Sequence, residues 1–454
     1  MSFLTATARV RALAADPGVR GAATSRIIAL VGAPVSLYLA ATRLRPDTQG
    51  YYFVAINILA IAQLCELGLG TIIVQFTSHA WPRLQWGLRG GLEGDPAALD
   101  TISAILLAAI RWFSVAALVL FVITGIGGEL LFGPTMSGDR FGFAVLWFSF
   151  IALTAVYLPV IPFLCVAEGC GDLVALQRMR SWQAGGILVG LWTGIFFGGP
   201  LLAAWIAAAL QLAIAVAWLA RRHPALLRSP KSLPAHFITA TRGIREHYRT
   251  EQLRSAKLWF ALNLAPQLLV PILLWLRGGD VAGRLGVTLA LALAPLTISV
   301  AWLHGRYPSL GVLAADGHTN EFETLARRAT IESVVVFIVC ALALIGAIQV
   351  LPYALPALAA RVMSTATLGA LLCGSFASLL QQAMAGYLRA FRDEAISTAI
   401  VTGNTAVVVV SAAAGRIGGA TAMVWGYAAA SLLIALPIVI VHFATTRRTR
   451  ISGA

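Results

Sequence analysis

The distribution of apolar residues constrains the fold of this chain more than any other feature. Apolar stretches long enough to cross a bilayer follow one another from Arg26 to His442, and the longest polar interruption lies at 221–257. A helix of about 20 apolar residues crosses a hydrocarbon layer of about 30 Å. Only 11% of the 454 residues are charged, whereas a water-soluble domain carries about a quarter. The sequence therefore predicts an all-α, polytopic membrane protein.

About twelve transmembrane helices fit this pattern, each bounded to within several residues. The predicted spans are 24–44, 51–74, 104–125, 141–163, 183–198, 200–219, 258–276, 285–303, 331–351, 365–386, 396–413 and 419–442.

Basic residues predict the orientation. With both termini in the cytoplasm, about 25 Lys and Arg residues face the cytoplasm and about 7 face outward, and the opposite orientation reverses that ratio. The formal charge of +14 is then mostly a determinant of topology, and it does not indicate a nucleic-acid partner.

The polar segment divides the spans six and six. This predicts a six-helix bundle at 1–220, a basic cytoplasmic linker at 221–257 and a second six-helix bundle at 258–454. Related turns recur six spans apart: HAWPRL at 79–84 matches HGRYPSL at 304–310, and AEGCGD at 167–172 matches AGYLRAFRDE at 385–394. Such pseudo-repeats are typical of transporters whose substrate path runs between the halves.

Proline and glycine mark two further features. Pro34 in the first span and Pro266 and Pro271 in its counterpart, the seventh, are candidate gating positions, although prolines are also simply tolerated in membrane helices. In the fifth span glycine recurs every fourth residue, at Gly186, Gly190, Gly194 and Gly198. This spacing predicts close packing with another helix rather than a binding site.

The run TRLRPDTQGYYFVAINILAIAQLCELGLGTIIVQFTSH at 42–79 resembles the first two spans of bacterial polysaccharide flippases, members of the multidrug/oligosaccharidyl-lipid/polysaccharide exporter superfamily. FLCVAEGCG at 163–171, AGYLRAFRDE at 385–394 and GRIGGATAMVWGY at 415–427 extend the resemblance along nearly the whole chain. The resemblance implies a multi-pass protein of the cytoplasmic membrane that moves a polyprenyl-diphosphate-linked oligosaccharide from the inner to the outer leaflet. Membrane lipids and other polysaccharide assembly proteins are the partners that it implies.

A sugar diphosphate needs a wet, cationic path, because an uncompensated charge in hydrocarbon costs tens of kcal/mol by Born reasoning. Arg111 in the third span is the candidate diphosphate contact, and Glu66 in the second span, at similar depth, is the candidate coupling residue. A structural ion pair between them is an equal alternative. Arg26, Arg180 and Lys257 are further candidate substrate contacts at the inner mouth, with snorkelling to lipid headgroups as the alternative for each.

Two other functions compete with flipping. A drug or cation antiporter of the same superfamily would favour acidic residues inside the bundle, where essentially Glu66 alone is found. A membrane glycosyltransferase or polymerase would need charged groups gathered in a sizeable outer loop.

The scattered cysteines and histidines predict no metal site, no cofactor is expected, and no GxxxxGK[ST] motif occurs. We therefore expect a transporter and not an enzyme.

Overall fold

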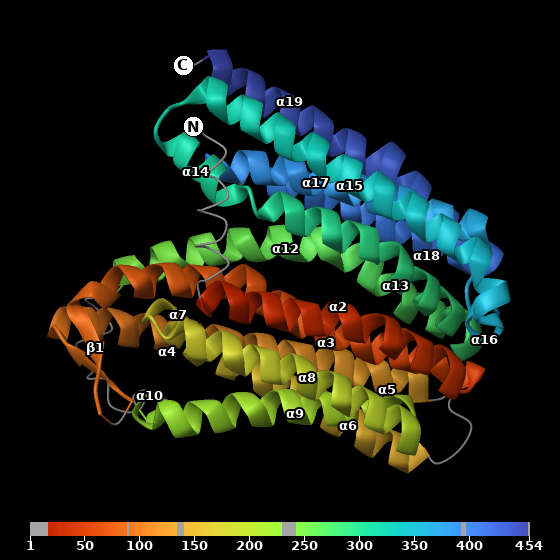
Figure 1. Ribbon diagram of the computed structural model, residues 1–454, viewed down its shortest axis with the longest axis horizontal. Coiled ribbons are helices and arrows are strands. Elements are labelled where there is room, and N and C mark those ends of the chain that lie inside the picture. The colour runs from red at the N-terminus through yellow and green to blue at the C-terminus, as the bar shows by residue number, and fades with distance from the viewer. Residues whose placement is uncertain (1–16, 89, 134–139, 229–241, 392–395, 453–454) are drawn as a thin grey trace. The chain divides into compact units, whose positions relative to one another are not determined.

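The computed structural model describes residues 17–88, 90–133, 140–228, 242–391 and 396–452 (Figure 1). Within these ranges the side chains are described except at 17–23, 26, 27, 29, 30, 63–69, 71, 72, 242–256, 259, 260, 264, 308, 315 and 449–452.

Helices make up nearly all of the described chain. They are α2 (Pro17–Arg43), α3 (Pro46–Ala80), α4 (Pro96–Leu120), α5 (Gly127–Phe132), α6 (Arg140–Tyr157), α7 (Ile161–Gly169), α8 (Leu173–Phe197), α9 (Pro200–Arg222), α10 (Pro224–Arg228), α12 (Arg242–Arg277), α13 (Gly279–His304), α14 (Tyr307–Ala315), α15 (Thr319–Ala354), α16 (Pro356–Ala359), α17 (Thr365–Ala390), α18 (Ile396–Ala430) and α19 (Leu436–Ser452). π-Helical turns at Phe121–Ile126 and Ser431–Ala435 connect α4 to α5 and α18 to α19, and a 3₁₀ turn at Leu158–Val160 connects α6 to α7.

The predicted spans fall within these helices and their connecting turns, except that 24–44 and 183–198 each extend one residue past the helix end. Seven helical segments of the described chain have the length and hydropathy to cross a membrane: Pro96–Phe132, Arg140–Gly169, Pro200–Arg222, Gly279–His304, Thr319–Ala354, Thr365–Ala390 and Ile396–Arg448. The prediction of a polytopic, all-helical membrane protein is thus confirmed.

The last of these segments reverses direction at Gly419. Its φ of 72° and ψ of −158° are not helical, and glycine adopts this region without the steric cost that a Cβ would bring. The residues on either side then pack against each other: a Cβ built on Gly426 would lie 2.9 Å from the Cβ of Ala414, and one on Gly403 would lie 2.9 Å from the Cα of Ala435. The predicted spans 396–413 and 419–442 meet at this turn.

The chain divides into two compact units. Unit 1 comprises Met1–Arg43 and Ala55–Leu253, and unit 2 comprises Leu44–Val54 and Arg254–Ala454.

In unit 1, the fifth predicted span packs backbone to backbone against the sixth. A Cβ built on Gly190 of α8 would lie 2.8 Å from the backbone nitrogen of Ala207 on α9, and one on Gly194 would overlap the Cα of Ala203. Real Cβ atoms do not approach so closely, so only glycine permits this separation. The predicted packing role of the glycine stripe is confirmed at these positions.

Unit 2 is built around α17, which is buried along much of its length. One apolar cluster joins α12, α17 and α18 through Leu258, Leu388 and Ile400. Asn404 of α18 reinforces the same contact, because its Nδ2 donates to the carbonyl oxygen of Ala261 at 2.7 Å and to Oε1 of Gln381 at 3.2 Å. A buried amide with two partners holds these three helices in one register.

The structure also contains a short antiparallel hairpin in unit 1 that the sequence pattern did not predict. Strand β1 (Leu84–Trp86) pairs with β2 (Leu92–Gly94), with Gln85 opposite Glu93. Trp86 anchors the hairpin, because its Nε1 donates to the carbonyl oxygen of Cys170 at 2.9 Å and its ring lies 4.1 Å from that of His223. The turn HAWPRL was expected only as a loop.

Candidate functional site

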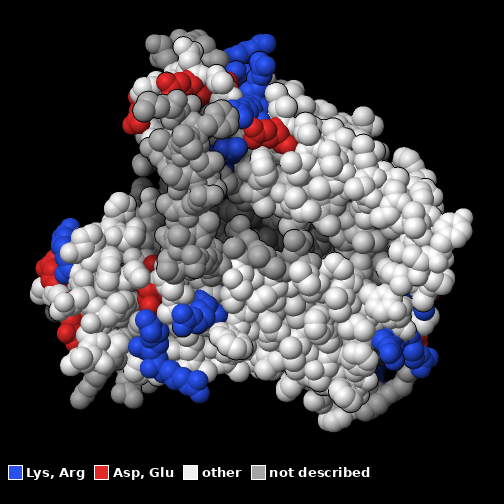
Figure 2. All heavy atoms as spheres, viewed as in Figure 1, with Lys and Arg blue, Asp and Glu red and all other residues white. Residues whose placement is uncertain are grey.

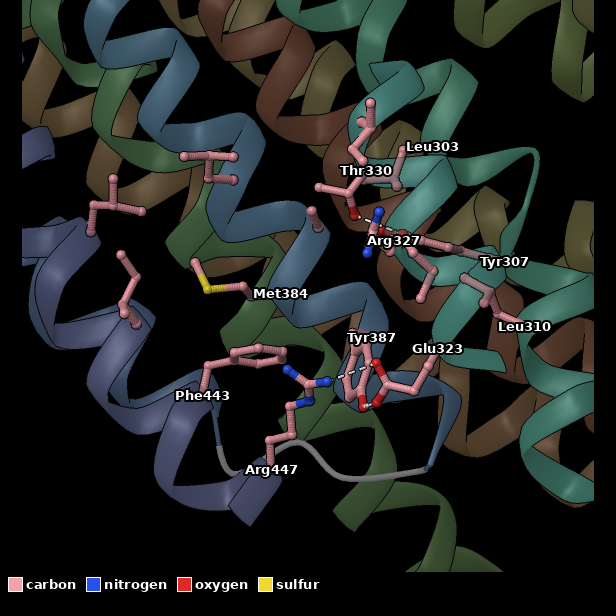
Figure 3. A pocket seen from close by; sticks show the side chains of 16 residues that line it. Leu303, Tyr307, Leu310, Glu323, Arg327, Thr330, Met384, Tyr387, Phe443 and Arg447 are labelled. Carbon is pink, nitrogen blue, oxygen red and sulfur yellow. Dashed lines mark hydrogen bonds and ion pairs between the residues drawn. The ribbon is translucent and has the colours of Figure 1, made fainter. Parts of the chain in front are cut away.

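A groove in unit 2 brings apolar and charged side chains together (Figure 3). We call it the unit 2 groove, and its volume is about 350 Å³. Helices α13, α14, α15, α17 and α19 contribute its walls. Its lining is Leu303, Tyr307, Leu310, Glu323, Ala326, Arg327, Thr330, Ile331, Leu380, Ala383, Met384, Tyr387, Leu436, Ile440, Phe443 and Arg447.

The charged part of the unit 2 groove is a cluster of three side chains from three helices. Arg447 points from α19 toward Glu323 of α15 and Tyr387 of α17 (Figure 3). Its Nη2 donates to Oε2 of Glu323 at 2.9 Å, and the hydroxyl of Tyr387 donates to the other carboxylate oxygen. The guanidinium carbon lies 5.9 Å from the centre of the Tyr387 ring. Glu323 is thereby neutralised within the cluster.

Two arginines in and beside this cluster have hydrogen-bond donors with no acceptor among the described residues. The Nε of Arg447 is buried and has no hydrogen-bond partner among the described residues. Arg327, one further turn along α15, is exposed and forms no ion pair within the described part of the chain. Two guanidinium groups against one carboxylate leave a positive charge at this end of the groove.

The rest of the lining is apolar. Met384 and Phe443 form its middle, and the Phe443 ring packs edge-on against Tyr387 with centroids 5.1 Å apart. An apolar trough that ends in surplus guanidinium donors fits an amphiphilic ligand with an anionic head.

The predicted substrate-binding residues lie elsewhere, and the structure describes three of their side chains. Arg111 is exposed on α4 and has no ion-pair partner among the described residues. Arg180 of α8 donates from Nη2 to Oε2 of Glu168 at 2.9 Å, so its charge is balanced inside unit 1. Lys257 is exposed on α12. The side chains of Arg26 and Glu66 lie outside the described residues, and the predicted pairing of Glu66 with Arg111 therefore stays a prediction.

The candidate gating prolines lie inside continuous helices rather than at breaks. Helix α2 runs through Pro34, and α12 runs through Pro266 and Pro271. Pro34 is exposed, Pro266 is buried and Pro271 is half-buried. The helices tolerate the missing donors, as membrane helices commonly do, and a gating role for these positions stays a prediction.

Sequence reasoning did not identify the cluster in the unit 2 groove. Glu323 and Arg447 lie 124 positions apart, and each is one of several charged residues near the end of an apolar stretch. The available signal was the excess of basic residues at 447, 448 and 450, which equally suits a topology determinant.

Several solved structures share this fold. No protein-family model matches the chain, and no curated protein matches it. Among solved structures, the lipid II flippase MurJ in an inward closed conformation aligns over 93% of this chain and 87% of its own, with a TM-score of 0.65 and 11% identity. An inward-facing multidrug resistance MATE family transporter of the MOP superfamily aligns over 95% and 98%, with a TM-score of 0.66 and 12% identity. A mutant form of the Vibrio cholerae MATE transporter VcmN aligns over 95% of both chains, with a TM-score of 0.56 and 14% identity.

These likenesses, together with the apolar helices, define a polytopic helical membrane protein with a transporter-type fold. In particular, the chain shares its fold with a lipid II flippase and with MATE transporters of the MOP superfamily, the group of proteins that the sequence resemblance indicated. The structural neighbours are transporters and not enzymes. At these identities the likeness establishes the fold alone, since one fold hosts many functions.

Proposed function

We propose that this protein moves a polyprenyl-diphosphate-linked oligosaccharide from the inner to the outer leaflet of the cytoplasmic membrane by alternating access, for surface polysaccharide assembly. It does so as two six-helix bundles with both termini in the cytoplasm. A lipid II flippase shares the fold over most of the chain. That protein is a flippase of lipid II, and this supports a lipid substrate here.

The observation that carries this proposal is the charge balance of the helices. Three acidic side chains described on the apolar helices are held by basic partners: Glu168 by Arg180, Glu323 by Arg447, and Glu332 by Arg306 and Arg328. Asp100 and Glu321 are exposed in the first two turns of α4 and α15. Arg111 and Arg327, in contrast, have no acidic partner in the described part of the chain. Beyond the first two turns of these helices, the charge left uncompensated among the described residues is positive, which suits a diphosphate and opposes an organic cation.

The unit 2 groove supports a lipid-linked substrate in particular. We propose that its trough takes a stretch of the prenyl chain and that Arg327 and the free Nε of Arg447 face the diphosphate. An apolar chain and an anionic head on one molecule match the two parts of the lining.

A drug or cation antiporter is the second candidate, because MATE transporters match the fold as well as the flippase does. That function would place a carboxylate where a cation can reach it, and Glu66 is the residue that the sequence offers. The molecule that is transported distinguishes the two functions. Vesicles containing an antiporter accumulate or release a cationic dye against a proton or sodium gradient, whereas a flippase moves lipid-linked sugar.

The proposal is tested by leaflet accessibility in proteoliposomes. A fluorescent lipid-linked oligosaccharide is incorporated, and a membrane-impermeant reductant reports the fraction in the outer leaflet. We expect the protein to make nearly all of the probe accessible, and Arg111→Ala and Glu66→Gln to slow this exchange. Arg284→Ala is the matched control, because Arg284 is likewise an exposed helical arginine and the proposal gives it no role. If the wild-type protein leaves half of the probe protected, it is not a flippase of this substrate class.

A further inference from the structure

A second groove, in unit 1, lies where α8 and α9 separate. The two helices run antiparallel and pack most tightly around Gly190 and Gly194. Toward the start of α8 and the end of α9 the lining residues Ala175 and Ala217 are small, and a groove of about 460 Å³ opens between the helices. We call it the unit 1 groove.

Three arginines line the unit 1 groove. Arg222 is committed to Asp172, to which both its Nε and its Nη2 donate. Arg178 and Arg221 are exposed, and no acidic partner for either lies among the described residues. Figure 2 shows Lys and Arg side chains gathered over the part of unit 1 where α9 meets α10, while the surface farther along α9 is mostly uncharged. Two unbalanced guanidinium groups therefore face one groove.

Two tryptophans accompany these arginines. Trp182 follows Arg178 by one turn of α8, and Trp218 precedes Arg221 by one turn of α9. Trp182 is 70% exposed although its ring is apolar. Tryptophan in this position is typical of the boundary between the hydrocarbon and the headgroup layer, where its indole touches acyl chains and its N–H stays near polar groups.

On both helices an arginine thus lies nearer the helix end than the tryptophan, as a lipid headgroup lies outside its acyl chains. From the end of α9 inward, Arg221 is followed by Trp218 and then by Ile214. From the start of α8 inward, Arg178 and Met179 are followed by Trp182. We propose that the unit 1 groove binds an anionic glycerophospholipid of the bilayer, with its phosphate between Arg178 and Arg221 and an acyl chain against Trp182. Charge complementarity selects an anionic headgroup over a zwitterionic one, because a choline or ethanolamine group would bring a cation toward the arginines.

Native mass spectrometry of the purified full-length protein tests this site, with phosphatidylglycerol and phosphatidylcholine as probes. We expect phosphatidylglycerol to be retained in preference to phosphatidylcholine. The double variant R178Q/R221Q should weaken its binding about 25-fold, at roughly fivefold for each arginine near the membrane surface. The control R83Q/R284Q removes the same number of positive charges from outside the groove, and we expect it to bind as the wild-type protein does.

Brominated acyl chains locate the bound lipid independently of affinity. Phosphatidylglycerol with brominated chains should quench part of the indole fluorescence, and the quenched part should shrink in W182F/W218F, a variant that keeps the arginines. Equal retention of the two lipids, or equal loss in the double variant and its control, would overturn the proposal. So would displacement of the lipid by inorganic phosphate alone, which would indicate a phosphate site, or by stoichiometric polyprenyl phosphate, which would assign the groove to the transported substrate.

Discussion

Asp172 lies 2.9 Å from His223, measured from Oδ2 to Nε2, and this contact joins the start of α8 to the end of α9. Both side chains are nearly buried, with 10% and 3% of their surfaces exposed. Arg222 donates to the same carboxylate, and the His223 ring packs at a tilt against the Trp86 ring of the hairpin, with centroids 4.1 Å apart. Asp172 is therefore the centre of a small polar network that fixes three segments of unit 1.

Removing this carboxylate should destabilise unit 1. Asp172→Ala leaves His223 buried and Arg222 without its partner, and we expect a loss of about 2–4 kcal/mol. Thermal unfolding in detergent, followed by tryptophan fluorescence, measures the change. The control is Glu321→Ala, because Glu321 is 69% exposed and lies 3.7 Å from His318, and such a pair contributes at most about 1 kcal/mol. Equal shifts for both variants would contradict a special role for Asp172.

The same network predicts a response to acid. Burial raises the pKa of Asp172, but hydrogen bonds from His223 and Arg222 and the Arg222 charge outweigh it, and the net pKa is lowered. A carboxyl with a lowered folded-state pKa stabilises the fold fully above its ordinary pKa of about 4 and loses this contribution as the pH falls through the folded-state value. Wild-type stability should thus decline more steeply than that of Asp172→Asn below about pH 4. Parallel pH profiles would refute this assignment.

Alanine substitutions at Gly194 and Gly185 of α8 distinguish the effect of helix packing on stability from the effect of intrinsic helix propensity. A Cβ on Gly194 would overlap Ala203, whereas one on Gly185 meets nothing within 4 Å. Gly194→Ala should therefore cost about 1–3 kcal/mol of stability, and Gly185→Ala should be neutral or stabilising by up to about 1 kcal/mol. Unfolding midpoints of the two purified variants give the comparison, and a harmless Gly194→Ala would show that α8 and α9 can separate at no cost.

Filling the unit 2 groove should impair transport without unfolding the protein. Met384 lies in the middle of the lining, and Met384→Trp would occupy space that we assign to the prenyl chain. We expect flipping at least several-fold slower, and a normal rate for Met384→Leu, which nearly conserves volume. Initial rates in the accessibility assay, at matched protein incorporation, provide the measurement. Unchanged rates for the tryptophan variant would remove the groove from the transport path.

Transport of an anionic headgroup should respond to membrane potential. Outward movement of one negative charge from a negative interior releases about 2.3 kcal/mol per 100 mV. We expect a valinomycin-imposed potassium gradient, negative on the side of the chain termini, to raise the outward rate and the opposite gradient to lower it. A neutral lipid-linked analogue provides the control. Insensitivity of the anionic probe would argue that a coupled ion cancels its charge.

The sequence predicted local features well because hydrophobic length and residue size are properties of short segments. The spans fell inside helices and their connecting turns to within one residue, and Gly190 and Gly194 packed as their spacing indicated. Contacts between distant segments were not accessible in this way. Trp86 meets Cys170 across 84 positions and Arg447 meets Glu323 across 124. A lone tryptophan or arginine at a helix end equally suits a membrane anchor, so nothing local distinguished these residues from their neighbours.

The reversal at Gly419 has a practical consequence for mapping which side of the membrane each loop occupies. The turn at Gly419 is too short to accept an inserted epitope without displacing the helices on either side. One added residue would rotate the following helix by about 100°. Small probes suit this corner better. Ile417 is 86% exposed, and a cysteine placed there, in a background lacking the native thiols, would report sidedness through an impermeant maleimide while leaving the helical register intact.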